Sequence, residues 1–295
     1  MNSTIFLEGM RMFKRKLKIK RKGFEKYSGN DVEICRKIIS DCYNKGKKYF
    51  QVSAGKDSNY PEFYSRDFGW CVESLINLGY KKEVLNTLKY SLEIYSDKKN
   101  KQGITVAINP RGKTFNFPNV YSPDSTAYFF RSLRVAGAKD LILKYSDFLN
   151  REIKKFEETA IDKEKGIVNG KHFSGMRDHS IVNASCYDMI MACSLCDEID
   201  KINKLVGRNI LNNRLTKYLL KKKLIKYYWT GKYFRNTPDD NILAGHNNVY
   251  PFFLDIIKDK KILKSCICEL IKYKYDEPFP LKYEKRKTWS FSALK

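Results

Sequence analysis

Apolar residues recur at spacings of three and four along most of this chain, which predicts a succession of amphipathic helices. In the clearest case, 81–95, the apolar residues fall on one helix face: Val84, Leu85, Leu88, Leu92 and Tyr95. Asn30 or Asp31 is a suitable N-cap for the first such segment. The pattern predicts helices over 31–50, 67–79, 81–95, 124–136, 139–157 and 179–196, one or two within 198–226, then 241–257 and 260–275.

Alternate predicted helices begin next to an aspartate. Asp67, Asp124, Asp178 and Asp240 follow one another at steps of 57, 54 and 62 residues, which is room for one helical hairpin and a loop. If these helices all start at one end of the molecule, the four carboxyl groups converge on one cleft. Aspartate is also a favoured N-cap, so each residue could serve only to stabilise a helix start.

The predicted helices come in pairs, one charged and apolar on a single face, the other apolar nearly all round. Such a difference is expected of two layers, because inner helices are buried on more than one side. Long glycine-containing loops at 102–124, 163–178 and 228–240 lead into the more apolar helices. We therefore expect an all-α toroid of repeated helical hairpins over 29–295 as a single domain, preceded by a basic arm at 1–28.

The composition excludes several classes of protein. The chain contains 42% hydrophobic residues but no apolar run long enough to span a bilayer, and no apolar stretch follows its basic N-terminus. We expect a cytoplasmic protein with no membrane partner. Eight cysteines lie mostly within apolar helical patterns, which favours buried free thiols over a disulfide framework or a zinc site. No metal or cofactor motif is present, so we expect neither.

The net charge of +24 suggests that the protein binds a negatively charged partner such as nucleic acid. Nine basic residues lie within 11–26, opposed only by Glu25, and such a segment could bind RNA, anionic lipid or an acidic protein. The remaining excess is spread along helix exteriors without a recognised nucleic-acid motif. A basic all-helical protein associated with nucleic acid is thus an alternative, although the pattern does not favour it.

Four segments resemble the six-hairpin glycosidases, the (α/α)6-barrel superfamily of glucoamylases, trehalases and neutral invertases. Tyr64-Ser65-Arg66-Asp67-Phe68, with Trp70, is similar to the aromatic-x-Arg-Asp element that opens their first inner helix. Pro123-Asp124-Ser125 is similar to the segment that opens the second. Ser174-Gly175-Met176-Arg177-Asp178 resembles the trehalase segment that contains the general acid, and the following Asn183 and Tyr187 match an Asn and an aromatic position. The segment from Trp229 to Phe234 resembles the entry to the fourth inner helix.

This resemblance implies a glycoside hydrolase that acts on a glucoside or short oligosaccharide by inversion. One carboxyl group then protonates the leaving oxygen, and a second activates water. The residues implied for substrate binding are Arg66, Asp67, Trp70, Tyr64, Asp124, Arg177 and Trp229, with Phe117 and Tyr121 as further aromatic platforms. Asp178 is the implied general acid. His172 and His246 could hydrogen-bond a sugar.

The chain departs from that family at its C-terminal part. The family has six hairpins, and this sequence contains about five, so that the expected toroid is incomplete. Glu277 and Glu284 are the nearest candidates for the general base, and we assign it to Glu284, although neither lies in a matching motif. A carbohydrate-binding relative without a base is therefore the alternative to an enzyme. An open ring exposes apolar flanks, so we expect association with a second copy of the chain.

Overall fold

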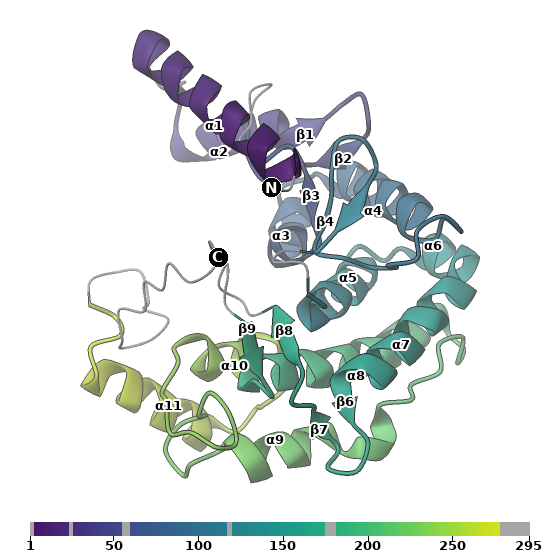
Figure 1. Ribbon diagram of the computed structural model, residues 1–295, viewed down its shortest axis with the longest axis vertical. Helices are drawn as coiled ribbons and strands as arrows, with labels where there is room; N and C mark the ends of the chain where they lie inside the picture. Colours follow the sequence, from purple (N-terminus) through teal and green to yellow (C-terminus); the bar gives the residue numbers. More distant parts are fainter. Residues whose placement is uncertain (1–2, 24–25, 55–59, 117–119, 175–180, 278–295) are drawn as a thin grey trace.

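The computed structural model describes residues 3–23, 26–54, 60–116, 120–174 and 181–277. The described part of the chain is mostly helical, with 56% of its residues in helices and 9% in strands (Figure 1). The helices are α1 Ser3–Lys22, α2 Asp31–Cys42, α3 Ser65–Asn77, α4 Lys81–Tyr95, α5 Pro123–Val135, α6 Lys139–Lys144, α7 Ser146–Ala160, α8 Cys186–Val206, α9 Leu220–Tyr228, α10 Tyr250–Phe253 and α11 Lys260–Lys272, with 3-10 turns η1 Thr216–Tyr218 and η2 His246–Asn248.

The prediction of a purely helical protein needs correction, because short antiparallel strands connect the helices. The strands are β1 Tyr43–Asn44, β2 Tyr49–Phe50, β3 Phe63–Tyr64, β4 Ala107–Ile108, β5 Thr114–Phe115, β6 Ile161–Asp162, β7 Ile167–Val168, β8 His172–Ser174 and β9 Ile181–Asn183. They pair as β1-β2, β3-β4-β5, β6-β7 and β8-β9. Strands of two or three residues give too little alternation for a sequence pattern to reveal them. Three of the sheets lie in or beside the long loops that lead into α3, α5 and α8.

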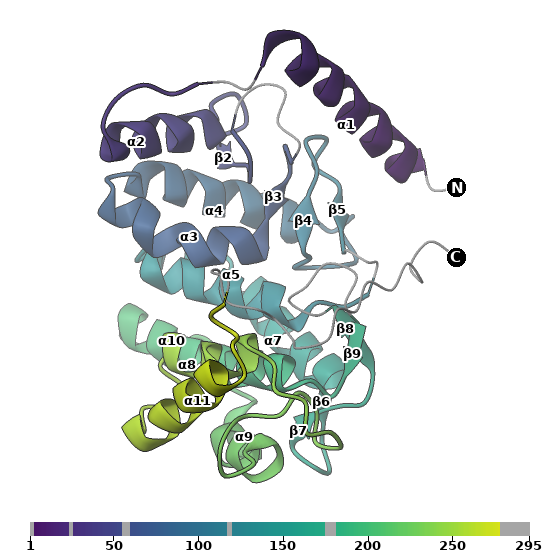
Figure 2. The ribbon, with the colours of Figure 1, turned by 90° about the vertical axis from the view of Figure 1, so that its left-hand side faces the viewer.

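Three helices, α3, α5 and α8, form the centre of the molecule, with α5 packed between the other two. Figure 2 shows the helices in successive layers, from α2 through α3 and α4 to α5, then α8, α9 and α11. Every residue of α5 from Pro123 to Leu133 is buried, whereas α3 buries only one face. The expectation of helices that are apolar all round is thus confirmed for α5 and for most of α8, but is wrong for α3.

The three central helices run parallel. Their first turns meet, because Arg66 of α3 contacts Asp124 of α5, which contacts Tyr187 of α8. Their later turns also meet, since Arg131 of α5 reaches Glu73 of α3. Each of Arg66, Asp124 and Tyr187 is the second residue of its helix. The prediction that alternate helices begin at one end of the molecule is confirmed for these three.

Several predicted boundaries were wrong. The helix expected over 31–50 ends at Cys42, where β1 and β2 form a hairpin, although the Asn30 cap is confirmed and forms a capping box with Glu33. The helix expected over 139–157 is divided at Tyr145 into α6 and α7. The helix expected from 179 begins instead at Cys186, after β9. Strand pairing marks the end of α2 and the late start of α8, where Ser185 also caps the helix, whereas no side-chain cap marks the division at Tyr145.

The single helix expected over 241–257 does not form. The chain instead forms η2 and the four-residue α10, followed by a loop up to Lys260. Pro251 supplies no backbone N–H for an α-helical bond, and Asp255 adopts a positive φ of 58° that ends the turn. These local features outweighed the apolar pattern.

The basic arm expected at 1–28 contains a regular helix, α1, over 20 of its residues. In the described part of the chain, no helix is long and apolar enough to cross a membrane. All cysteines are free, but the expectation that they are buried is only partly confirmed. Cys186, Cys193 and Cys266 are buried, whereas Cys35, Cys71 and Cys268 are exposed.

Candidate functional site

An ion pair joins the first turns of the three parallel helices. Arg66 Nη1 donates to Asp124 Oδ2 at 3.2 Å, and the Tyr187 hydroxyl donates to the same oxygen at 3.0 Å. Ser122 Oγ donates to Asp124 Oδ1 at 2.5 Å. The positive ends of the helix dipoles also favour a carboxylate at this position. Asp124 is therefore held by groups from α3, α5 and α8.

Aromatic rings surround this ion pair. The Arg66 guanidinium lies 5.6 Å from the centroid of the Trp70 ring, one helical turn further along α3. The Trp70 ring contacts Tyr250, and the Tyr187 ring contacts both Tyr250 and His246. We call these six residues the Arg66 cluster: Arg66, Trp70, Asp124, Tyr187, His246 and Tyr250. Four of them, all but Asp124 and Tyr187, are half-buried, so the cluster reaches the protein surface.

Asp124 does not cap its helix. The N-cap residue of α5 is Ser122, and its side chain forms no capping hydrogen bond. The Asp124 side chain is 1% exposed and its oxygens accept bonds from other side chains. The capping hypothesis is thus wrong at this position. A buried carboxylate with these donors orients Arg66 and cannot itself activate a solvent water.

Sequence reasoning missed a second buried carboxyl, that of Asp188 in the first turn of α8. Burial raises its pKa well above the usual range, and the nearby Asp124 charge raises it further. The Ser185 hydroxyl donates to Oδ2 at 2.6 Å, whereas Oδ1 has no hydrogen-bond partner. The signal that could have found it is the Ser185-x-x-Asp188 spacing, which is typical of a helix N-terminus. Burial thus favours the protonated form of Asp188 relative to an aspartate in water.

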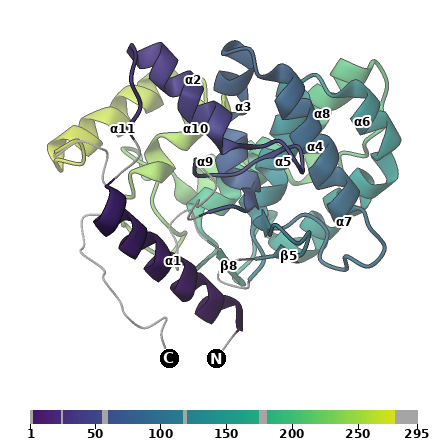
Figure 3. The same ribbon diagram turned by 90° about the horizontal axis from the view of Figure 1, so that it is seen from above.

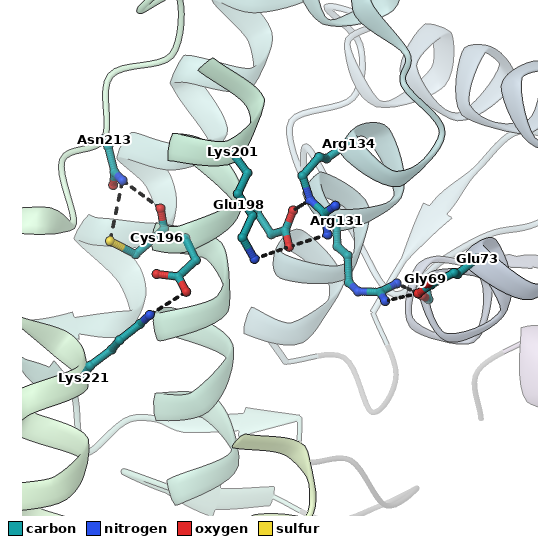
Figure 4. Close-up of polar contacts among 10 residues, drawn as sticks. Gly69, Glu73, Arg131, Arg134, Cys196, Glu198, Lys201, Asn213 and Lys221 are labelled. Atoms are coloured by element: carbon teal, nitrogen blue, oxygen red, sulfur yellow. Dashed lines mark hydrogen bonds and ion pairs between the residues drawn. The ribbon is translucent and has the colours of Figure 1, made fainter. Parts of the chain in front are cut away.

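Further polar contacts tie the same helices together beyond their first turns (Figure 4). Arg131 of α5 donates to the Gly69 carbonyl of α3 at 3.1 Å and pairs with Glu73 at 2.9 Å. Arg134 of α5 forms a two-pronged pair with Glu198 of α8. Lys221 of α9 pairs with Asp197 of α8 at 2.7 Å, and Asn213 bonds to Cys196 of α8. These contacts fix how the helices lie against one another and thereby hold the first turns in place.

The remaining predicted site residues lie elsewhere or outside the described residues. Asp67 lies on another face of α3, where burial and then the Asp67 charge raise the pKa of the Cys71 thiol. Tyr64 lies on β3 at the entry to α3, and its ring contacts Tyr60. Trp229 follows α9 and packs on Phe234 at 5.1 Å. The predictions that fall outside the described residues concern Phe117, Arg177, Asp178 and Glu284.

Asp240 does not open a helix. It closes a local turn, in which its Oδ1 accepts from the backbone N–H groups of Thr237 and Ile242 at 3.2 and 3.0 Å. The Tyr121 ring contacts Phe156 and Phe173, so this predicted platform belongs to an aromatic group beside α7 and β8. Of the predicted site residues, the structure brings Arg66, Trp70, Asp124 and His246 together.

Within the described ranges, no three His, Cys, Asp or Glu side chains are grouped so that they could hold a metal ion. A cavity of about 550 Å³ lies near the end of α8, far from the Arg66 cluster at its start. It is lined by Asp200, Asn203, Lys204, Gly207, Arg208 and Asn209. Because these residues are mostly loop and helix-end groups with mixed charge, we assign them no function.

No protein-family model matches the chain, and no curated protein matches it either.

Proposed function

We propose that the chain binds a glucoside or short oligosaccharide at the Arg66 cluster and hydrolyses it by inversion, with Asp178 as the general acid that protonates the leaving oxygen and Glu284 as the general base that takes the proton of the attacking water. The observation that carries this proposal is the Arg66–Asp124 pair at the start of three parallel helices, with the Arg66 guanidinium over Trp70.

The charge of the cluster favours an uncharged ligand. Asp124 compensates the Arg66 cation at 3.2 Å, so an anionic ligand would find no uncompensated positive charge at this point. The Arg66 side chain is 12% exposed, and a guanidinium can donate several hydrogen bonds in one plane. Neighbouring hydroxyl groups of a sugar present acceptors at a matching spacing.

The aromatic rings supply the other half of carbohydrate recognition. Trp70 and Tyr250 are half-buried and in contact, with ring centroids 6.5 Å apart. Their apolar faces suit the C–H face of a pyranose ring, because that face loses little hydration free energy when it leaves water. His246 adds a polar group at the same edge, beside the Tyr187 ring. An arginine with aromatic neighbours thus supports a sugar more than a nucleotide phosphate.

The architecture supports the same proposal. Helices α4, α7 and α9 pack on the parallel helices α3, α5 and α8, respectively, and this order fits an arc of an (α/α) toroid. The segment with Asp178 joins β8 to β9, and β9 leads directly into α8. Asp178 therefore belongs to the connection that precedes Tyr187 of the cluster.

A carbohydrate-binding protein without catalysis is the second candidate. The observation that favours it is the burial of Asp124 and Asp188, because neither carboxyl can accept a proton from a water that attacks a substrate. The two candidates share the ligand and differ only in turnover.

The variant Asp178→Asn distinguishes the glycoside hydrolase from the carbohydrate-binding protein. The amide keeps the shape of the acid but cannot protonate a leaving oxygen, so we expect hydrolysis of α-glucosides to fall by at least about a hundredfold. The melting temperature should remain nearly unchanged. The measurement is reducing-sugar release from a panel of α-linked oligosaccharides, with the anomer of the product followed by NMR. Binding without turnover by the unmodified protein would favour the second candidate, and a large loss of stability in the variant would assign Asp178 to capping.

A further inference from the structure

Helix α1 is the most basic element of the molecule. Its 20 residues include eight lysines and arginines and one acidic residue, Glu8. Lys20, Arg21 and Lys22 form its last turn. Figures 1 and 3 show it on the outside of the molecule, beyond α2 and away from α5 and α8.

Three large apolar side chains of α1 are exposed to solvent. Met10 is 44% exposed, Phe13 59% and Leu17 40%. Their spacing of three and four residues places them within about 60° of one another around the helix. They form a continuous apolar stripe along about two turns, which we call the α1 stripe.

The opposite side of α1 faces the protein. Arg15 and Ile19 lie roughly across the helix from the α1 stripe, and both are half-buried. Lys14 and Arg21 lie next to the stripe along one edge, and Lys16 and Lys20 along the other, all of them exposed. The stripe is therefore directed outward between two rows of cations.

We propose that α1 docks the protein on an anionic lipid bilayer, with the α1 stripe inserted among the acyl chains and the flanking cations at the headgroups. A helix lying in the membrane interface has this arrangement of an apolar face and a strongly basic polar face. Both apolar burial and electrostatic attraction can therefore contribute to the free energy of binding. Each buried apolar side chain adds to the first, and each lysine or arginine near an anionic surface adds to the second.

The stripe distinguishes a bilayer from nucleic acid. Phosphates would be contacted by the cations alone, and an apolar stripe that points outward would stay in water. On a bilayer the same side chains leave water. The expectation of no membrane partner therefore changes in one respect: α1 rests on the membrane surface and does not cross it.

The test is flotation of the full chain with large unilamellar vesicles. One set consists of phosphatidylcholine, and the other contains about 30% phosphatidylserine, a level at which polybasic segments are attracted. We expect binding to the anionic vesicles at least about tenfold tighter than to the neutral ones at about 0.15 M salt. The double variant Phe13→Ser/Leu17→Ser should lose at least about tenfold in affinity, because two inserted side chains are removed.

Ile267→Ser/Ile271→Ser is the matched control. These two α11 residues are 44% and 57% exposed and lie four positions apart, as Phe13 and Leu17 do. The control should bind vesicles as the unmodified protein does, and circular dichroism and melting curves should show all proteins folded. Equal vesicle binding by the two double variants would overturn the proposal. Absence of binding to anionic vesicles would also overturn it. So would a result in which neither double variant loses vesicle binding and the α1 double variant still binds a single-stranded oligonucleotide.

Discussion

A single carboxyl group at Asp124 shows how partners and burial decide the role of a residue. Aspartate at a helix start is usually a cap, but here three side-chain donors hold it and its exposure is 1%. The spacing of the predicted helix starts indicated Asp124, and the resemblance to six-hairpin glycosidases indicated Arg66 and Trp70 as members of the same site. The sequence could not predict Tyr187 as the donor to Asp124, since that contact depends on the register between α5 and α8.

The buried acid Asp188 leads to a prediction about pH. Its pKa is raised by burial above the ordinary value of 3.8, so the native state keeps the proton to a higher pH than the unfolded chain does. Its contribution to stability is fully present below about pH 4 and is lost as pH rises toward the folded pKa. Asp188→Asn removes this loss, so the gap in melting temperature between variant and unmodified protein should widen in favour of the variant from about pH 5 to pH 8.

Glu157 provides the control for that experiment because its pKa shifts in the opposite direction. Burial raises the pKa of Glu157, but hydrogen bonds from Lys217, Arg214 and Tyr218 outweigh burial and lower it to about 2. Its contribution is present above the ordinary value of 4.5 and is lost as pH falls toward 2. Glu157→Gln should therefore lower the stability of the protein at neutral pH. It should also reduce the change in stability with pH at acid pH. Parallel pH profiles for Asp188→Asn and the unmodified protein would show that Asp188 does not bind the extra proton.

At the scale of elements, periodicity predicted where helices exist but not always where they begin. The bounds of α4 were predicted without error, whereas the start of α8 was placed at 179 instead of Cys186. Ser185 caps α8 through the N–H of Asp188, and the short strands β8 and β9 precede it. A capping pattern four residues long carries less weight in a sequence than an apolar stripe, although here it decides the boundary.

At Gly69, α3 and α5 pack too closely to leave room for a side chain. A Cβ at this position would lie 2.5 Å from the Tyr128 Cβ, which is attached to the α5 backbone and cannot move away independently. Gly69→Ala should destabilise the protein by about 1–3 kcal/mol despite the better helix propensity of alanine. Urea unfolding measures the change. Gly170→Ala is the control, because nothing lies within 4 Å of its added Cβ, and its effect should stay within about 0.5 kcal/mol.

The Gly69 experiment also tests the helix arrangement. If Gly69→Ala is as stable as the unmodified protein, α3 and α5 do not pack at this distance. The first turns that carry Arg66 and Asp124 would then need another support.

At the scale of the whole molecule, one positional rule links fold and proposed function. Arg66, Asp124 and Tyr187 each occupy the second position of a helix, and parallel packing brings the three positions together. The fourth expected helix start, at Asp240, fails because Asp240 closes a turn with Thr237. The expectation that alternate helices begin at one end of the molecule is thus met for α3, α5 and α8 and fails in the region of η2 and α10. Association with a second copy of the chain stays a prediction.

The most direct test of the Arg66 cluster as a sugar site is isothermal titration calorimetry with short oligosaccharides and iminosugars on two matched variants. Arg66→Lys keeps the charge opposite Asp124 but loses the planar donor fork, and Arg134→Lys makes the same change in the pair with Glu198, further along the same helices. We predict that Arg66→Lys weakens sugar binding by at least about tenfold, whereas Arg134→Lys leaves the affinity unchanged. Equal affinities in both variants, or no heat with any sugar for the unmodified protein, would contradict the account.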